Sequence, residues 1–359
     1  MRAPVSVGVV GLGHWGPNLA RVFDGLPQAD LKWLCDQRPD VRLALRTRFP
    51  NAQVTADYSD LLEDDSLDAI VVATPSATHY ELAMQALHAD KHVFVEKPLA
   101  LSHAHADELV GVAERKHRCL MVGHVMLFHP AIRKLKELIE RGELGEIFYL
   151  YANRQNLGKV RQDENALWSL GAHDIAVLLY LLEDQPVEVS ARGESYVQPG
   201  IADVVFCYLR FATGISAHLH LSWLDPHKMR RLTVVGSDRM AVVDDMETER
   251  KLTLYDKSAT PRPTGDFGEY VQVRFGDIVC PRLRNDEPLR LECEHFLSTV
   301  RSSTFTATRA REAACVVEIL AALQRSLDNG GLPESLGGSV GSAVVSMFDR
   351  PRVGDRRVV

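Results

Sequence analysis

The sequence predicts an α/β Rossmann domain with a parallel sheet, followed by an α+β domain with a large, mostly antiparallel open sheet. Three observations predict this fold. Strand-like and helix-like segments alternate through the first third of the 359 residues, which is typical of βαβ units. A glycine-rich turn directly follows the first strand-like segment. Beyond Gly123, strand patterns instead follow one another with turn signals between them, as in an antiparallel sheet.

The first domain is expected to span residues 1–123. Its first strand, at 5–10, is a β-branched apolar run of the kind that is buried on both faces of a parallel sheet. Further strands are predicted at 30–35, 69–73, 92–96 and 119–122, with a short strand or loop at Val54. Helices are predicted at 17–23, 41–49 and 80–89, and from Ser102, as N-cap, toward Arg115.

The second domain is expected to span residues 124–330. A helix at 130–141 ends at Gly142, and two late helices at 289–300 and 309–326 return to pack on the body. Strands are predicted at 147–154, 187–197, 204–211, 215–223, 231–235 and 240–244. Residues 331–359 are rich in Gly, Ser and Arg and are expected to form a flexible tail.

Composition excludes several classes of protein. The hydrophobic fraction of 46% and charged fraction of 25% are those of an ordinary globular chain. A net charge of -7 argues against nucleic acid as a partner, and no apolar run approaches the length of a membrane helix. Six cysteines occur singly, without a CxxC pair, so neither a metal site nor a disulfide framework is expected. Reduced thiols indicate a cytoplasmic protein.

The turn Gly11-Leu12-Gly13-His14-Trp15-Gly16 has the GxGxxG pattern of a dinucleotide-binding loop. Its context is a strand before it, a helix after it, and Asp36 at the end of the second strand, where an acidic residue binds the adenosine ribose. Phosphates would lie at the N-terminus of the helix. Asp36 should repel a 2′-phosphate, which favours NAD over NADP, although Arg38 is close enough to blur that preference.

Two further segments carry residues suited to proton transfer. Lys97 follows the strand at 92–96, at the sheet edge where ligands bind in open α/β folds. Partial desolvation and a nearby nicotinamide would lower the pKa of this lysine, although a lysine at a strand end is more often a surface charge. His173 lies near the start of an apolar helix that continues through Leu182, where it is either an acid/base or a capping or core histidine.

Together, the glycine turn, Ala73-Thr74-Pro75-Ser76, Glu96-Lys97-Pro98 and the downstream His173 resemble the Gfo/Idh/MocA oxidoreductase family over roughly residues 5 to 330. The segment from Asn156-Leu157-Gly158 to Ala172-His173-Asp174 is most similar to the nucleotide-sugar 3-dehydrogenase branch, which oxidises the C3 hydroxyl of UDP-N-acetylaminouronic acids.

The resemblance implies roles for individual residues. Lys97 would relay the proton, with a cis peptide before Pro98, and His173 would be the second acid/base. The residues implied at the cofactor are Gly11, Gly13, His14, Trp15, Gly16, Asp36, Thr74, Pro75, His79, Glu96, Lys97 and Trp168. Those implied at the substrate are Lys97, His124, Asn156, Arg161, Asn165, Ser169 and His173, with Arg161 suited to a carboxylate or phosphate.

One position departs from the family pattern. Many members place an aspartate four residues before the histidine, one helical turn away, where it orients or tunes the imidazole. This chain has Ser169 there, which hydrogen-bonds but supplies no charge. Asp174 does not obviously replace it, because adjacent residues on a helix point to different faces.

The predicted reaction is hydride transfer between NAD and a secondary alcohol or ketone carbon of a sugar, in either direction, with a nucleotide-linked sugar as the favoured substrate. The alternatives are an inositol or free-sugar dehydrogenase and, from another class, a non-catalytic dinucleotide-binding sensor. His218 and His220 share a strand face, which favours a subunit contact over a metal site. A homodimer or homotetramer is expected, because a large open sheet usually needs a partner.

Overall fold

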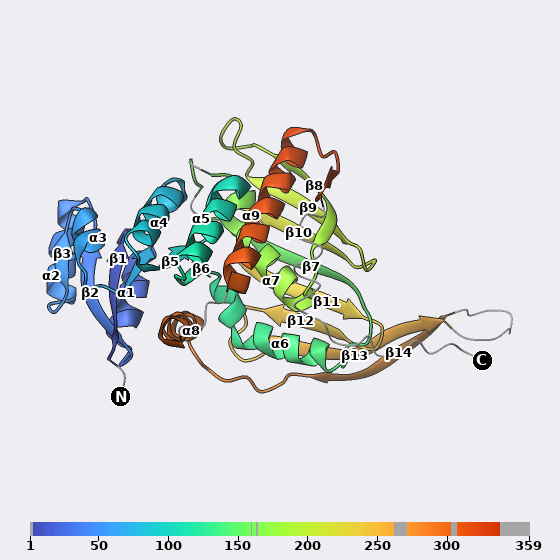
Figure 1. The fold of residues 1–359 in the computed structure, drawn as a ribbon. Coiled ribbons are helices and arrows are strands. Elements are labelled where there is room, and N and C mark those ends of the chain that lie inside the picture. Colours follow the sequence, from blue (N-terminus) through green and yellow to red (C-terminus); the bar gives the residue numbers. More distant parts are fainter. Residues whose placement is uncertain (1–2, 159, 163, 262–270, 303–306, 338–359) are drawn as a thin grey trace.

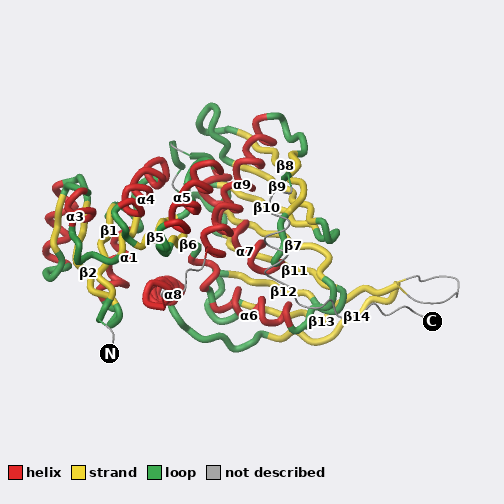
Figure 2. The backbone as a smooth tube through the Cα atoms, viewed as in Figure 1, coloured by secondary structure: helices red, strands yellow, loops and turns green. Residues whose placement is uncertain are grey.

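The structure is a computed structural model that describes residues 3–158, 160–162, 164–261, 271–302 and 307–337. Over these residues the chain forms two sheets side by side, each accompanied by helices (Figure 1, Figure 2). The parallel sheet contains the amino-terminal residues, and the larger sheet contains the rest of the strands. This is the fold class that the sequence predicts.

The first sheet is parallel throughout, with the strand order β3-β2-β1-β4-β5-β6. Its elements are β1 Val5–Val10, α1 Gly16–Asp24, β2 Ala29–Cys35, α2 Pro39–Arg48, β3 Gln53–Thr55, α3 Ser59–Glu63, β4 Ala69–Val72, α4 His79–His88, β5 His92–Glu96, α5 His103–Arg115 and β6 Leu120–Gly123. Every residue of β1 and β4 is buried, which explains why the two strands are apolar apart from Ser6. Ser102 caps α5 as predicted, because its hydroxyl accepts from the backbone N–H of His105.

The second sheet has the strand order β14-β13-β12-β11-β7-β10-β9-β8-β15. The elements of this part are α6 Pro130–Glu140, β7 Ile147–Gln155, α7 Ala172–Leu182, β8 Pro186–Glu194, β9 Val204–Phe211, β10 Ser216–Ser222, β11 Met229–Gly236, β12 Met240–Asp244, β13 Leu252–Pro261, β14 Val271–Val279, α8 Pro288–Ser302, α9 Ala307–Asp328 and β15 Glu334–Ser335. All neighbouring pairs are antiparallel except β7 with β10. The sheet is therefore mostly antiparallel, as predicted.

Four elements are additions to the predicted set: α3, β13, β14 and β15. The last of these falls at the start of the segment expected to be a tail, where Glu334 pairs with Val189 of β8. Residues 338–359 lie outside the described residues. None of the helices in the described ranges is long and apolar enough to cross a membrane.

The two late helices return to the body of the protein, as predicted, and connect its parts. Phe296 of α8 packs edge-on against Phe23 and Phe94 of the parallel-sheet domain, with ring centroids 6.3 and 5.6 Å away. On α9, Val317 belongs to a core cluster of the first sheet, whereas Leu320 belongs to the core of the second. In Figure 1, α9 accordingly runs between α5 and the second sheet.

Candidate active site

A cleft with a volume of about 1740 Å³ lies at the carboxyl ends of the parallel strands and extends to the second sheet. Sites for single small ligands are usually about 300–1,000 Å³, so this cleft is large enough for a cofactor and a substrate together. Its lining includes most of the residues that the sequence singled out: Gly11, Gly13, His14, Trp15, Asp36, Thr74, Pro75, His79, Glu96, Lys97, Asn156, Arg161, Ser169 and His173.

The glycine turn has a backbone that only glycine allows. Gly11 has a φ of +85°, and a Cβ there would lie 2.6 Å from the backbone nitrogen of Thr74. A Cβ on Gly16 would lie 2.0 Å from the carbonyl oxygen of Gly11. At Gly13 the nearest atom to such a Cβ is 3.6 Å away, on Arg38, so this part of the backbone is open to the cleft. Gly16 is therefore a packing residue, and Gly13 faces the ligand space.

The carboxylate of Asp36 is already fully hydrogen-bonded. Leu12 donates its backbone N–H at 2.9 Å, and the guanidinium of Arg38 donates from Nε at 3.0 Å and from a terminal nitrogen at 2.9 Å. Burial alone would raise the pKa of Asp36, but these hydrogen bonds outweigh it and hold the pKa below its usual value. The end of β2 thus presents an anion and a cation together, as expected from the nearby Arg38.

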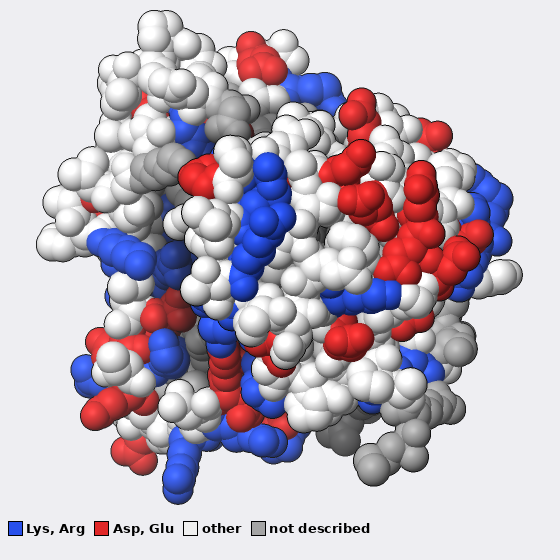
Figure 3. Space-filling model, turned by 90° about the vertical axis from the view of Figure 1, so that its left-hand side faces the viewer, with Lys and Arg blue, Asp and Glu red and all other residues white. Residues whose placement is uncertain are grey.

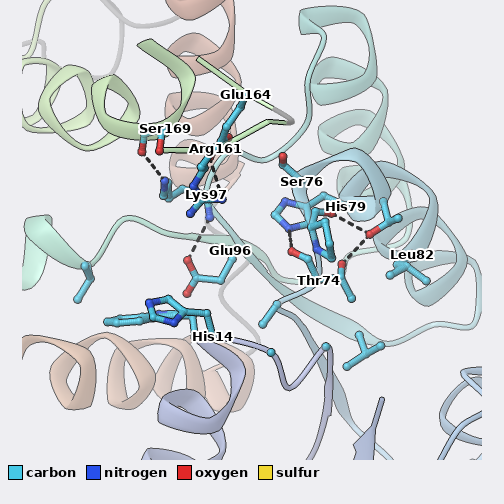
Figure 4. Close-up of a pocket in the computed structure, with 18 of the residues that line it drawn as sticks. His14, Thr74, Ser76, His79, Leu82, Glu96, Lys97, Arg161, Glu164 and Ser169 are labelled. Atoms are coloured by element: carbon cyan, nitrogen blue, oxygen red, sulfur yellow. Dashed lines mark hydrogen bonds and ion pairs between the residues drawn. The ribbon is translucent and has the colours of Figure 1, made fainter. Parts of the chain in front are cut away.

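His79 joins the turns that follow two neighbouring strands. Its Nδ1 lies 2.7 Å from the carbonyl oxygen of Pro98, and its Nε2 lies 2.9 Å from that of Thr74. Burial lowers the pKa of His79, and a neutral imidazole donates to only one of these two acceptors at a time. The peptide between Lys97 and Pro98 is cis, as the family resemblance implies. Figure 4 shows His79 between Thr74 and this segment.

The lysine after β5 points into the cleft rather than to solvent. Its Nζ donates to the backbone carbonyl oxygen of Ser169 at 2.8 Å (Figure 4). Burial lowers the pKa of Lys97, while the carboxylates of Glu164 and Glu96 oppose that change. Burial also raises the pKa of Glu96 to about 7, and its Oε1 has no hydrogen-bond partner among the described residues. The environment suits a lysine that exchanges a proton.

The imidazole of His173 also faces the cleft, but it is surrounded by positive charge. Burial lowers its pKa well below the usual value, and Lys97 and Arg154 lower it further. These effects favour the neutral imidazole, and the role of His173 as a second acid/base stays a prediction. His124 is also buried, and burial with the charge of Lys97 lowers its pKa to about 4, but it does not line the cleft.

Besides Gly16 and His124, two more of the expected ligand-binding residues do not line the cleft, namely Asn165 and Trp168. Asn165 donates its amide to Oε1 of Gln324 on α9 at 2.8 Å, and the indole N–H of Trp168 donates to the same atom at 3.1 Å. Trp168 also packs against both hydrophobic cores. Both residues therefore hold the π-helical turn Leu167–Gly171 against α9, directly before His173.

The cleft also contains charged residues that the sequence analysis missed. Arg154 forms a buried bidentate pair with Asp174, at 2.7 Å from Nε to Oδ2 and 2.8 Å from a terminal nitrogen to Oδ1. One signal was available, because Arg154 shares its strand face with the buried Leu150 and Ala152. The other missed charged lining residues are Asp57, Glu81, Glu164, Lys228 and Arg230.

Figure 3 shows one face of the surface, on which basic and acidic side chains are both present and the acidic ones gather on the right. Among the described residues, no group of three or more His, Cys, Asp or Glu side chains is arranged to hold a metal ion. His218 and His220 instead stack on Tyr151 and Phe206, with ring centroids 5.3 and 4.3 Å apart.

Comparisons with known proteins agree with this geometry. Residues 5–124 match the family described as "Oxidoreductase family, NAD-binding Rossmann fold", and residues 132–242 match the "GFO/IDH/MocA C-terminal domain". UDP-N-acetylglucosamine 3-dehydrogenase of Acidithiobacillus ferrooxidans is 31% identical over 265 residues, which cover 72% of this chain and 79% of that protein. Myo-inositol 2-dehydrogenase of Thermotoga maritima is 28% identical over 335 residues, covering 90% and 96%.

A solved structure shares the whole architecture. GenD2 from gentamicin A biosynthesis, in complex with NAD, has a TM-score of 0.78 and 25% identity to this chain, covering 94% of this chain and 97% of that one.

Proposed function

The chain belongs to the Gfo/Idh/MocA family of NAD-binding oxidoreductases, and from this premise we propose that it oxidises a secondary alcohol of a nucleotide-linked sugar, at C3, to the ketone. The C–H hydride passes to NAD⁺ and the hydroxyl proton passes to the protein. The observation that carries the proposal is a set of cationic side chains that line the same cleft as Lys97, namely Arg161, Lys228 and Arg230. Such groups suit a diphosphate or carboxylate, which a free polyol lacks.

The residues around the glycine turn fit a dinucleotide. Backbone at Gly13 is open to the cleft, and α1 begins at Gly16, so its first N–H groups are available to a pyrophosphate. Asp36 directly follows β2, where an acidic side chain binds the adenosine ribose, and Glu96 lines the cleft beside Lys97, where it would meet the nicotinamide ribose. When bound, NAD⁺ would supply the hydride acceptor. NADP is the less favoured cofactor because Asp36 repels a 2′-phosphate.

The protein's own groups manage the proton. Burial lowers the pKa of Lys97, which makes its Nζ better suited to take the hydroxyl proton from the substrate and to release it again. His173, as a neutral imidazole, hydrogen-bonds and orients that hydroxyl. Its Nδ1 is buried without a partner among the described residues, so a polar substrate group would satisfy it. Positioning by these two groups supplies much of the rate enhancement.

The first test is a substrate panel. We expect reduced-nicotinamide absorbance to appear when the protein is mixed with NAD⁺ and a UDP-linked N-acetylamino sugar or its uronic acid, and not with myo-inositol. Turnover with inositol or free sugars alone would overturn the proposed substrate and favour the inositol dehydrogenase alternative, to which the relative from Thermotoga maritima lends weight. Tight NAD binding without turnover in either direction would favour the sensor alternative.

We also propose that the protein assembles through the open face of its second sheet, as a homodimer or homotetramer. The described face of β7, β9 and β10 carries a layer of ring side chains. The stacked pairs are Tyr149 with Tyr151, Tyr151 with His218, and Phe206 with His220, and Tyr208 lies opposite His218 on β9. Phe206 and Tyr208 are 53% and 45% exposed, and a contiguous exposed aromatic patch of this kind marks an interaction site.

The assembly is tested by light scattering after size-exclusion chromatography. The double change Phe206→Glu with Tyr208→Glu is expected to shift the protein to monomer, because it buries two charges in the contact. Tyr196→Glu serves as the control, since Tyr196 is 71% exposed but follows β8 and lies outside this face. A monomeric unmodified protein at micromolar concentration would contradict the proposal.

We propose a cytoplasmic location for the protein. All six cysteines lie among the described residues as free thiols, and reduced thiols are typical of that compartment.

A further inference from the structure

A carboxylate outside the family pattern lies close to Lys97. The side chain of Glu164 is only 7% exposed and lines the same cleft. Its Oε1 forms an ion pair with Arg161 at 3.0 Å, and Arg161 is 41% exposed on the outer side of that pair. In Figure 4, Glu164 and Arg161 lie together above Lys97.

No other element supplies the charge that the family pattern places before the histidine. Position 169 is a serine, and its contribution to Lys97 is a backbone carbonyl that accepts a hydrogen bond. Asp174 follows His173 directly, but its carboxylate is neutralised by both donor groups of Arg154. The carboxylate that comes closest to the role of the family aspartate is therefore that of Glu164, in the segment between β7 and the π-helical turn.

The charged surroundings of Lys97 are otherwise mixed. Seven titratable or charged groups interact electrostatically with Lys97, namely Glu96, Glu164, Arg154, Arg161, His79, His124 and His173. Glu164 opposes the effect of burial on the pKa of Lys97 more than any other of these groups, and Arg161 acts in the opposite direction. A buried amine surrounded mainly by cations and neutral imidazoles needs such a carboxylate to hold a proton near neutral pH.

We propose that Glu164 is the positioning residue that replaces the family aspartate, with its carboxylate acting on Lys97 instead of on His173. It thereby keeps Lys97 able both to take up and to hold the hydroxyl proton, and Arg161 limits how strongly it does so. The inference rests on the proposed function, because it concerns the proton relay of that reaction. The negative charge that adjusts the proton affinity of the site then comes from Glu164, eight positions after Asn156, and not from the helix that carries His173.

The titration of Lys97 tests this directly. The full chain is prepared with lysine isotope-labelled at Cε, and the Lys97 resonance is identified by its absence in Lys97→Met. Glu164→Gln is expected to lower the pKa of Lys97 by about 1 pH unit, because an opposite charge is lost. Arg161→Gln is expected to raise it. Glu164→Asp should retain most of the original value, and Glu81→Gln, which removes another carboxylate of the same cleft, should leave it unchanged.

The kinetic readout has a defined sign. Alcohol oxidation needs the neutral amine, so kcat/KM falls as pH falls through the pKa of Lys97. A lower pKa in Glu164→Gln therefore moves the acid limb of the profile to lower pH by the same amount. A Lys97 titration identical in Glu164→Gln and the unmodified protein would overturn the inference, as would shifts of the same sign in Glu164→Gln and Arg161→Gln. A shifted titration in a protein that oxidises no sugar would sustain this inference and overturn the proposed function instead.

Discussion

Replacing Lys97 with methionine is expected to lower kcat for sugar oxidation by about a thousandfold while NAD still binds. Methionine fills a similar volume but has no proton to exchange and makes no hydrogen bond to the carbonyl of Ser169. The glycine turn and Asp36 are untouched by the change, so the dinucleotide site remains. Steady-state kinetics give kcat, and quenching of tryptophan fluorescence by NAD gives the binding constant.

A second buried lysine provides the matched control. Lys91 is 5% exposed and precedes β5, whereas Lys97 follows it, so the two lie at opposite ends of one strand. The Nζ of Lys91 donates to the carbonyl of Asp64 at 2.7 Å and does not line the cleft. Lys91→Met should leave kcat unchanged. If Lys97→Met retained full turnover on a proven substrate, the assignment of the proton relay would be wrong.

Asp174→Ala is expected to destabilise the fold by about 3–5 kcal/mol, because it leaves the guanidinium of Arg154 buried and unpaired. Both side chains of this pair are about nine-tenths buried, and Arg154 lies on β7 while Asp174 lies on α7. The pair therefore joins the second sheet to the helix that carries His173. Urea unfolding followed by circular dichroism measures the loss.

The control is an arginine–carboxylate pair of similar form at the surface. Arg210 of β9 donates from two nitrogens to Glu188 of β8, but at 3.3 and 3.4 Å and largely in solvent. Glu188→Ala should change stability much less, because water solvates the arginine that is left. Equal losses in the two variants would show that burial of the Arg154–Asp174 pair does not determine its importance.

Much of the first domain could be predicted from local sequence. Four of the residues 5–10 are valines because every residue of β1 is buried, and the glycine turn follows because Gly11 and Gly16 meet backbone where a side chain would not fit. The pattern that signals these constraints lies between residues close together in the chain, even where the contact itself is distant, as between Gly11 and Thr74. Short-range patterns therefore reveal them without knowledge of the tertiary fold.

The rest of the site depends on partners far apart in sequence. Asn165 and Trp168 precede a catalytic helix and resemble ligand-binding residues, yet Gln324, more than 150 positions later, holds both. The importance of Glu164 is likewise set by Lys97 from another domain. No periodicity or spacing within one segment identifies such contacts.

One missed element did have a local signal. Val271, Val273 and Phe275 alternate with polar residues, which is a strand pattern, but Gly276 and Asp277 interrupt it. In the structure β14 pairs with β13 on both sides of these two residues, and the register shifts where they lie. An irregularity in the pairing therefore accommodates two residues with weak strand propensity inside one strand.

The position of α8 affects how the chain is completed during synthesis. The core cluster that contains Phe23 and Phe94 also contains four residues of α8, namely Leu289, Cys293, Phe296 and Leu297. Part of the hydrophobic core of the first domain is therefore supplied by a helix that begins more than 160 residues after Gly123. The first 123 residues emerging from a ribosome would expose that apolar surface until α8 arrives. A boundary drawn at Gly123 therefore separates two sheets but not two independent folding units, and the amino-terminal segment on its own would be prone to aggregate.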